Sequence, residues 1–265
     1  MIGVAGCGRM GLPMLVALRR AGFDAVGFDL RPSSEFGEHA GIVGNDPDLF
    51  ARNLDTLITV VRDIPQTEDV LFDAQGFASA PGLQRILVCS TLSPRYVLTL
   101  RDRVPDHISL IDAPMSGAQV AAEEARLSFM LGGSEQDLAQ TQPMLDAMGH
   151  HFHHMGAYGS GMQAKVLNNL LAASHTAMTR LVLEWADAAG VDEAKLLNLI
   201  GTSSGQNWFA SGFNQIEFAR DGYEDDNTIG ILTKDIDSAL DAAPEGADTS
   251  LPLSIRNVIR QLSSR

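Results

Sequence analysis

The stretch IGVAGCGRMG, residues 2–11, joins a short apolar run to a glycine-rich loop and the beginning of a helical pattern. Gly6, Gly8 and Gly11 follow the spacing G-x-G-x-x-G, and apolar positions recur at helical intervals from there to Gly22. In such a loop the first glycine permits a tight turn, and the second lets a pyrophosphate approach the backbone. The third allows the helix to pack closely on the strand. The stretch therefore predicts a dinucleotide-binding βα unit, with the ligand at the N-terminus of the helix.

A second apolar run, residues 25–28, ends at an acidic residue, Asp29. A carboxylate at this point accepts hydrogen bonds from the adenosine ribose hydroxyls. It also repels a 2′-phosphate, so the sequence favours NAD over NADP, although Arg31 is placed to reach such a phosphate. We predict that these two segments bind the cofactor through Gly6, Gly8, Arg9, Met10, Gly11, Asp29, Leu30 and Arg31.

Strand-like and helical patterns alternate along residues 1–158, which predicts a mostly parallel, doubly wound sheet of the Rossmann type. From residue 159 onward the patterns are helical, beginning with a long apolar segment. We expect a dinucleotide-binding domain, residues 1–158, joined by a long helix to an all-α domain for substrate binding or oligomerisation, residues 159–265. Ligands bind beyond the carboxyl ends of parallel strands. The residues that follow predicted strands at that edge are Val61, Arg62, Thr91 and Ser116.

The long helical segment begins GSGMQAKVLNNLL, residues 159–171, and carries polar residues near its start. Lys165 and Asn169 are four residues apart and share one helical face. A lysine is rarely buried unless it is paired or functional. The alternative is a lysine at an exposed helix start, with its ammonium group in water. In a partly dry site the pKa of a lysine falls, so that it can accept a proton from an alcohol near neutral pH.

Four segments together resemble the β-hydroxyacid dehydrogenase family, which includes 3-hydroxyisobutyrate dehydrogenase. They are GVAGCGRMGLPM near the N-terminus, DAPMSGA at 112–118, GSGMQAKVLNNLL at 159–171 and TKDIDSALD at 233–241. The resemblance implies a reversible oxidation of a small anionic 3-hydroxy acid to its semialdehyde or ketone with a nicotinamide cofactor. It implies that Lys165 is the catalytic proton shuttle and that Asn169 holds the lysine and the substrate. It further implies substrate binding by Ser116, Gly117 and Ala118, and cofactor contacts by Thr91 and Lys234, with Val61 and Arg62 at the neighbouring strand end.

The chain departs from the family pattern at several positions. Ala118 replaces the second glycine after the serine, and Ala125 replaces a loop glycine. Val61 and Arg62 stand where many members have Leu-Pro, and Arg62 could reach the cofactor or an anionic substrate group, or be a solvated loop residue. Asn168 takes the place of a histidine in the 6-phosphogluconate dehydrogenase relatives and is a weaker candidate.

Two other functions are compatible with the fold. An imine reductase on the same scaffold generally lacks the lysine, so Lys165 argues against it. A dinucleotide-binding module without catalysis would be expected to lose Lys165 or the Ser116–Gly117 pair, and both are present.

The composition limits the partners. The net charge of −14 disfavours nucleic acid and anionic membranes as partners, and no apolar run reaches the roughly 18 residues that a membrane span needs. The N-terminus has no secretory signal, and Cys7 and Cys89 follow apparent strands, so we expect a cytoplasmic protein with reduced cysteines.

The histidines of the HHFHH segment, His150, His151, His153 and His154, permit a metal site, but an ordinary strand with surface histidines is favoured and no metal is expected. The long apolar helix suggests a homodimer or homotetramer, because an exposed apolar face normally finds a partner.

Overall fold

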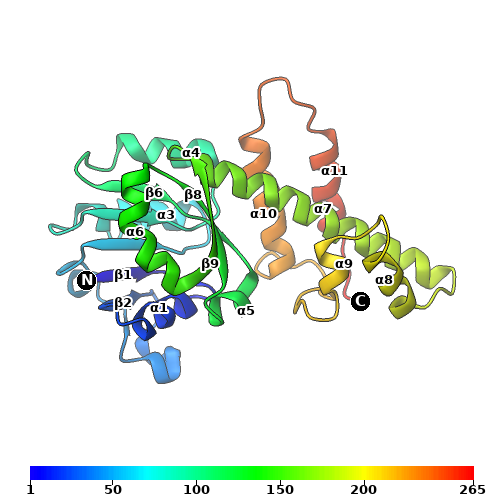
Figure 1. Cartoon of the computed structure of the whole chain (residues 1–265), viewed down its shortest axis with the longest axis horizontal. Coiled ribbons are helices and arrows are strands. Elements are labelled where there is room, and N and C mark those ends of the chain that lie inside the picture. The colour runs from blue at the N-terminus through cyan, green and yellow to red at the C-terminus, as the bar shows by residue number, and fades with distance from the viewer. The chain divides into compact units, whose positions relative to one another are not determined.

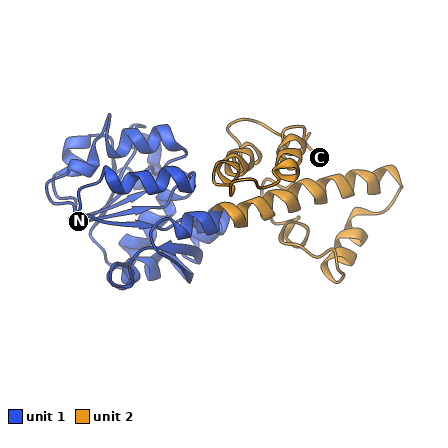
Figure 2. Ribbon diagram, turned by 90° about the horizontal axis from the view of Figure 1, so that it is seen from above, with its two compact units in different colours: residues 1–165 blue, residues 166–265 orange.

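The computed structural model describes all 265 residues and contains two compact units, Met1–Lys165 and Val166–Arg265 (Figure 2). The long helix α7, Ser160–Ala188, contributes residues to both units. The expected domain boundary between residues 158 and 159, just before α7, stays a prediction.

The first unit is built on a nine-stranded sheet in the order β3-β2-β1-β4-β5-β6-β8-β7, with β9 beside β8. The strands from β3 to β6 run parallel, whereas β8 is antiparallel to β6 and β7 and parallel to β9. Their bounds are β1 Ile2–Ala5, β2 Ala25–Phe28, β3 Val43–Gly44, β4 Thr56–Thr59, β5 Arg85–Val88, β6 Ser109–Asp112, β7 Met115–Ser116, β8 Leu127–Gly132 and β9 Gly149–Gly156.

Helices cover both faces of this sheet (Figure 1). Alternate strand residues point to opposite faces, so Val4 packs in one apolar cluster with α1 and α6, and Ala5 packs in another with α3 and α4. The fold predicted from the alternating pattern is confirmed. The helices of this unit are α1 Gly11–Arg20, α2 Pro47–Ala51, α3 Ile64–Leu71, α4 Pro94–Thr99, α5 Ala118–Glu123 and α6 Glu135–Met148, with 3₁₀ segments η1 Ser33–His39, η2 Phe77–Ser79 and η3 Leu100–Asp102.

The second unit is helical, as the sequence predicts. Besides α7 it contains α8 Glu193–Gly201, α9 Trp208–Gly212, α10 Thr228–Asp241 and α11 Ser250–Ile259. Phe209 and Phe213 are buried in its core, whereas Trp208 is partly exposed. The guanidinium group of the buried Arg180 donates hydrogen bonds to the carbonyl groups of Ala219, Asp221 and Ser263, and so ties α7 to two later segments. None of the helices is both long enough and apolar enough to cross a membrane.

Candidate active site

The glycine loop lies between β1 and α1, and a Cβ atom would have a different effect at each of its three glycines. Gly6 has φ +93°, and a Cβ there would lie 2.5 Å from the carbonyl oxygen of Val60. A Cβ on Gly11 would lie 1.9 Å from the carbonyl oxygen of Gly6. A Cβ on Gly8 would meet no protein atom within 4 Å. The packing of the protein therefore requires Gly6 and Gly11, while Gly8 leaves open space of the kind that a pyrophosphate approaching the backbone would use.

The helix that follows begins without a side-chain cap. Met10 occupies the N-cap position, no side chain accepts a hydrogen bond there, and the first turn contains no acidic residue. The positive end of the helix dipole favours an anion at this point. This end of α1 therefore fits the phosphates of a dinucleotide.

Asp29 lies directly after β2 and is tied to the same loop. Its carboxylate accepts hydrogen bonds from the backbone amide of Cys7 at 2.9 Å and from Nε and Nη2 of Arg31 at 3.0 and 3.1 Å. Burial by itself would raise the pKa of Asp29, but the hydrogen bonds from Arg31 and Cys7 outweigh it and hold the pKa below its ordinary value. The carboxylate is therefore charged at neutral pH and oriented beside the glycine loop.

The side chain of Arg31 is held in place by several contacts with the protein. Besides pairing with Asp29, its Nη2 donates to the carbonyl oxygen of Cys7 at 3.0 Å, and its guanidinium carbon lies 4.6 Å from the ring centroid of Phe36. Burial and the Asp29 carboxylate raise the pKa of the Cys7 thiol to about 12, so this thiol is not a nucleophile at neutral pH.

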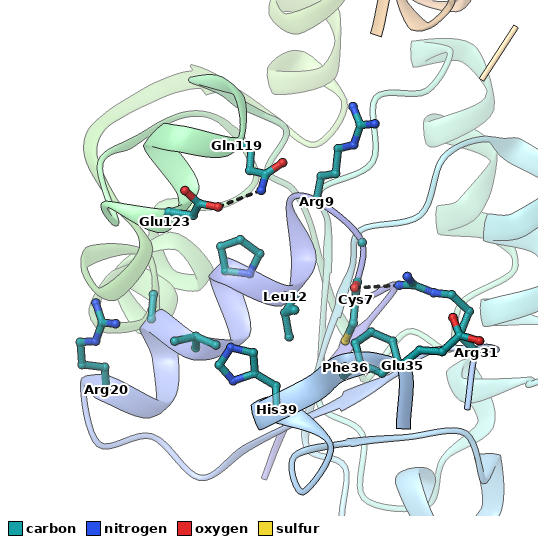
Figure 3. Close-up of a pocket in the computed structure, with 14 residues that line it drawn as sticks. Cys7, Arg9, Leu12, Arg20, Arg31, Glu35, Phe36, His39, Gln119 and Glu123 are labelled. Atoms are coloured by element: carbon teal, nitrogen blue, oxygen red, sulfur yellow. Dashed lines mark hydrogen bonds between the residues drawn. The ribbon is translucent and has the colours of Figure 1, made fainter. Parts of the chain in front are cut away.

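A cavity of about 440 Å³ borders the glycine loop and runs along α1 (Figure 3). Gln119 and Glu123 of α5 flank α1 on one side, and Phe36 and His39 of η1 flank it on the other. The residues predicted to bind substrate do not line this cavity. Its walls are formed by Cys7, Gly8, Arg9, Leu12, Pro13, Val16, Ala17, Arg20, Arg31, Glu35, Phe36, His39, Gln119 and Glu123.

The segments after β4 and β5 are joined by a hydrogen bond from the backbone amide of Val61 to Oγ of Ser90, at 2.9 Å. The backbone amide of Arg62 donates to Oε1 of Gln66 at 3.0 Å. The Arg62 side chain is exposed and lies just before α3. Because β1 pairs with β4 and β4 with β5, the predicted cofactor residues Val61, Arg62 and Thr91 reach the same sheet edge as the glycine loop. Leu30, after β2, is 73% exposed.

The predicted substrate loop begins in β7 and continues into α5. Gly117 has φ +137°, and a Cβ there would lie 2.5 Å from Cβ of Ala121, so the chain requires glycine at this position. Ala118 has φ +55° and Ala125 has φ +53°, both in the left-handed region. The two alanines that replace family glycines therefore keep a backbone conformation that favours glycine.

Lys165 lies in the second turn of α7 and is 7% exposed. The alternative interpretation, a lysine whose ammonium group lies in water at an exposed helix start, does not fit this burial. The preceding turn is fixed by Asp112 at the end of β6, whose carboxylate accepts hydrogen bonds from the amides of Gly159 and Met162. Burial raises the pKa of Asp112, and these hydrogen bonds offset that effect only in part.

One turn further along α7, Asn169 belongs to a polar group of the second unit. Its Nδ2 donates to Oδ2 of Asp235 at 2.6 Å, and Oδ1 of Asp235 lies 3.2 Å from Nζ of Lys234. Nδ2 of Asn168 donates to Oδ1 of Asn169 at 3.3 Å. The structure therefore brings Asn169 and Lys234 together around one carboxylate.

Sequence patterns assign no separate role to Ser90 or Asp112, although each is a buried polar residue at or just after a strand end. The histidines of residues 150–154 lie along β9, and Nε2 of His154 is within hydrogen-bond distance of the carbonyl oxygens of Gly133 and Gly156. The structure contains no group of three or more His, Cys, Asp or Glu side chains arranged to hold a metal ion.

Comparisons with known proteins agree with this arrangement. Residues 1–156 match the NAD binding domain of 6-phosphogluconate dehydrogenase, and residues 159–265 match the NAD-binding domain of NADP-dependent 3-hydroxyisobutyrate dehydrogenase. L-Threonate dehydrogenase of Cupriavidus necator is 31% identical over 260 residues, which cover 96% of this chain and 86% of that protein. 3-Hydroxyisobutyrate dehydrogenase of Pseudomonas aeruginosa is 30% identical over 262 residues, covering 95% and 88% of the two chains.

Among solved structures, 3-hydroxyisobutyrate dehydrogenase from Salmonella typhimurium has the same fold, with a TM-score of 0.83, 24% identity, and coverage of 97% of this chain and 92% of that one. The matches extend over both units, and both family models describe binding of a nicotinamide dinucleotide. The chain belongs to the β-hydroxyacid dehydrogenase family of nicotinamide-dinucleotide-dependent oxidoreductases.

Proposed function

We propose that this protein is an NAD-dependent dehydrogenase that interconverts a small anionic 3-hydroxy acid and its semialdehyde or ketone, with Lys165 as the proton shuttle. The observation that carries the proposal is the burial of Lys165, 7% exposed, one helical turn before Asn169. Lysine is among the residue types least often found buried, so burial at the position that the family resemblance assigns to the proton shuttle supports that role.

The chain has three lysines, Lys165, Lys195 and Lys234, among its 19 basic residues. Arginine is always protonated and cannot serve as a general base near neutral pH, whereas lysine can. A lysine at the buried position of α7 therefore suits proton transfer better than it suits a structural role.

A bound nicotinamide cofactor would supply the acceptor for the hydride that leaves the hydroxyl-bearing carbon of the substrate. As that hydride leaves, neutral Lys165 takes the hydroxyl proton, so the alcohol becomes a carbonyl group. In the reverse direction the ammonium form of Lys165 returns the proton. Ser116 and Gly117 bind the substrate carboxylate through a hydroxyl group and backbone amides.

Asn169 contributes orientation without charge. A carboxylate can only accept, so Asp235 holds Nδ2 of Asn169 and leaves Oδ1 as the group that accepts a hydrogen bond from the substrate hydroxyl or the lysine. A cofactor contact by Lys234 stays a prediction.

The choice of NAD rests on Asp29. The Asp29 carboxylate accepts a hydrogen bond from the amide of Cys7 in the glycine loop, and a negative charge at this place favours ribose hydroxyls over a 2′-phosphate. Arg31 donates to the same carboxylate. Arg31 would have to leave Asp29 to bind a 2′-phosphate, which supports NAD over NADP.

An apolar stripe on α7 supports a homodimer or homotetramer. Leu167, Leu171, Met178 and Trp185 are 53%, 62%, 60% and 68% exposed, and their spacing places them on one helical face. We expect Leu171→Glu to lower the molar mass measured by light scattering during size-exclusion chromatography. A wild-type protein that is monomeric at all concentrations would refute this part of the proposal.

The central test is the change in nicotinamide absorbance when purified protein is mixed with L-threonate, 3-hydroxyisobutyrate and other small 3-hydroxy acids, using NAD⁺ and NADP⁺ separately. We expect turnover with NAD⁺, and a fall in kcat of about 100- to 10,000-fold for Lys165→Ala. Lys195→Ala, an exposed lysine on α8, is the matched control and should keep wild-type kcat.

A small primary amine added to Lys165→Ala should restore part of the activity, because it supplies the missing proton acceptor. Wild-type kcat in Lys165→Ala, or no turnover of any 3-hydroxy acid with either cofactor, would overturn the proposal.

A further inference from the structure

Asp112 is a fully buried carboxylate, 0% exposed, at the end of β6. Its Oδ1 accepts a hydrogen bond from the backbone amide of Gly159 at 2.7 Å, and its Oδ2 accepts one from the amide of Met162 at 2.5 Å. These amides belong to the residue before α7 and to the third residue of the helix. They are the two donors that a capping box satisfies with side chains of the helix itself.

Helix α7 cannot supply this cap from its own N-cap position. That position is Gly159, which has no side chain and adopts φ +93°, and a Cβ there would lie 2.8 Å from Cδ2 of Leu98. Gly159 and Met162 are both buried, so their amides would be costly without an acceptor. Asp112 provides that acceptor from 47 and 50 residues earlier in the chain.

The packing around this cap leaves little room for movement. A Cβ on Gly132 would lie 2.1 Å from Oδ1 of Asp112, and a Cβ on Gly161 would lie 2.4 Å from the carbonyl oxygen of Met130. On another side, the amide of Leu92 donates to Sδ of Met162 at 3.4 Å. The first turn of α7 is thus fixed against β6, β8 and the segment after β5.

Two functional segments depend on this anchor. Lys165 follows Met162 by one turn of the same helix. In the other direction, the chain runs from Asp112 through two residues into β7, which ends at Ser116. One carboxylate therefore connects the beginning of the lysine helix to the strand that leads into the predicted substrate loop.

We propose that Asp112 is a positioning residue that sets the place of Lys165 relative to the substrate loop by capping α7 from the end of β6. The inference rests on the proposed role of Lys165 as the proton shuttle. Asp112 itself is buried against backbone amides and does not take part in proton transfer. Its effect is geometric, because small displacements of a reacting group lower rates strongly.

The test compares Asp112→Asn and Asp112→Ser with wild type at a temperature well below unfolding. Asparagine places an NH₂ group against one of the two amides, and serine accepts from one amide only. We expect kcat to fall about 10- to 100-fold while the KM for NAD stays unchanged. We also expect a larger deuterium isotope effect with substrate deuterated at the hydroxyl-bearing carbon, since the chemical step becomes slower. The serine variant provides the same readouts if the asparagine variant does not fold.

Asp192→Ala is the control, because Asp192 caps α8 by accepting from the amide of Lys195 at 2.9 Å, alanine removes that acceptor, and α8 carries no proposed site residue. It should lower the thermal midpoint without changing kcat or the isotope effect. If the Asp112 variants behave like this control, Asp112 is a structural cap only and the inference fails. Lys165→Ala tested in parallel separates the two proposals, because wild-type activity in that variant refutes the proton shuttle whatever the Asp112 variants do.

Discussion

Asn169 donates a hydrogen bond from Nδ2 to Oδ2 of Asp235 at 2.6 Å, and Asp235 is only 4% exposed. A carboxylate has no hydrogen to donate, so this contact determines which end of the Asn169 amide faces Asp235. Nζ of Lys234 lies 3.2 Å from the other carboxylate oxygen, so both oxygens of Asp235 have a polar neighbour. Asp235 therefore sets the direction of the Asn169 carbonyl oxygen.

The first prediction follows from this contact. Asp235→Asn allows the amide of residue 169 to turn over, and we expect kcat/KM for the hydroxy acid to fall by about tenfold or more, since a hydrogen bond to a charged group is worth about 1.5–3 kcal/mol. A double-mutant cycle with Asn169→Ala should show that the two effects are not additive.

The control is Asp237→Asn on the same helix, where the carboxylate is 43% exposed and pairs with Arg256. It should leave kcat/KM unchanged. Additive effects of Asp235→Asn and Asn169→Ala would contradict the coupling proposed here.

The parts of the site that lie close together in the sequence could be predicted from it. The glycine loop, Asp29 at the next strand end, and the one-turn separation of Lys165 and Asn169 all follow from spacings shorter than a βαβ unit. Local spacing determines which face of a helix or which end of a strand a residue occupies, so these positions do not depend on the rest of the fold.

The contacts that hold these residues could not be predicted, because their partners are distant in the sequence. Asp112 and Met162 are 50 residues apart, and Asn169 and Asp235 are 66 residues apart. In the fold, β3 with two residues and α2 with five are too short to show a hydrophobic period, and the sequence did not indicate them. The antiparallel direction of β8 depends on pairing with β6 and β7, which periodicity does not reveal.

The second prediction concerns cofactor choice. We expect kcat/KM to be at least about tenfold higher with NAD⁺ than with NADP⁺, because a 2′-phosphate next to the Asp29 carboxylate costs several kcal/mol of like-charge repulsion. Asp29→Asn removes the charge and releases Arg31, so this ratio should fall. Initial rates with both cofactors check it. Asp24→Asn, a residue just before β2, is the control. A preference for NADP⁺ in wild type would make Arg31 the selecting residue.

The third prediction concerns the two alanines in the left-handed region. Ala118→Gly and Ala125→Gly should each raise the free energy of unfolding by about 0.5–1 kcal/mol, because relief of backbone strain exceeds the entropy cost of glycine in the unfolded chain. Ala122→Gly, inside α5, should lower it by about 1 kcal/mol. Urea denaturation measures all three. Of the two strained sites, Ala118 alone lies in the predicted substrate loop, so only Ala118→Gly is expected to change the KM of the hydroxy acid. A loss of stability in both strained positions would show that the alanines are accommodated without strain.

The fourth prediction concerns stability in acid. Arg103 donates to both carboxylate oxygens of Glu68, at 2.7 and 2.6 Å, and the hydroxyl group of Tyr96 donates to Oε1 at 2.7 Å. The hydrogen bonds from Arg103, with a smaller contribution from Tyr96, hold the pKa of Glu68 below its ordinary value of 4.5. A group with a lowered pKa in the folded state contributes stability above its unfolded pKa, and that contribution is lost as the pH falls through the folded pKa.

Glu68→Gln should therefore lower the free energy of unfolding at neutral pH by about 1 kcal/mol, a value kept small because Arg103 is partly exposed and the pair is screened. Below pH 4.5, the ordinary pKa of this carboxyl group, the difference between wild type and Glu68→Gln should shrink progressively. Urea titrations of both proteins across this range measure it. Glu38→Gln is the control, since the Glu38 side chain is 88% exposed and should show no such convergence. A constant difference between wild type and Glu68→Gln at all pH values would mean that the variant loses packing and not the ionic hydrogen bonds to Arg103.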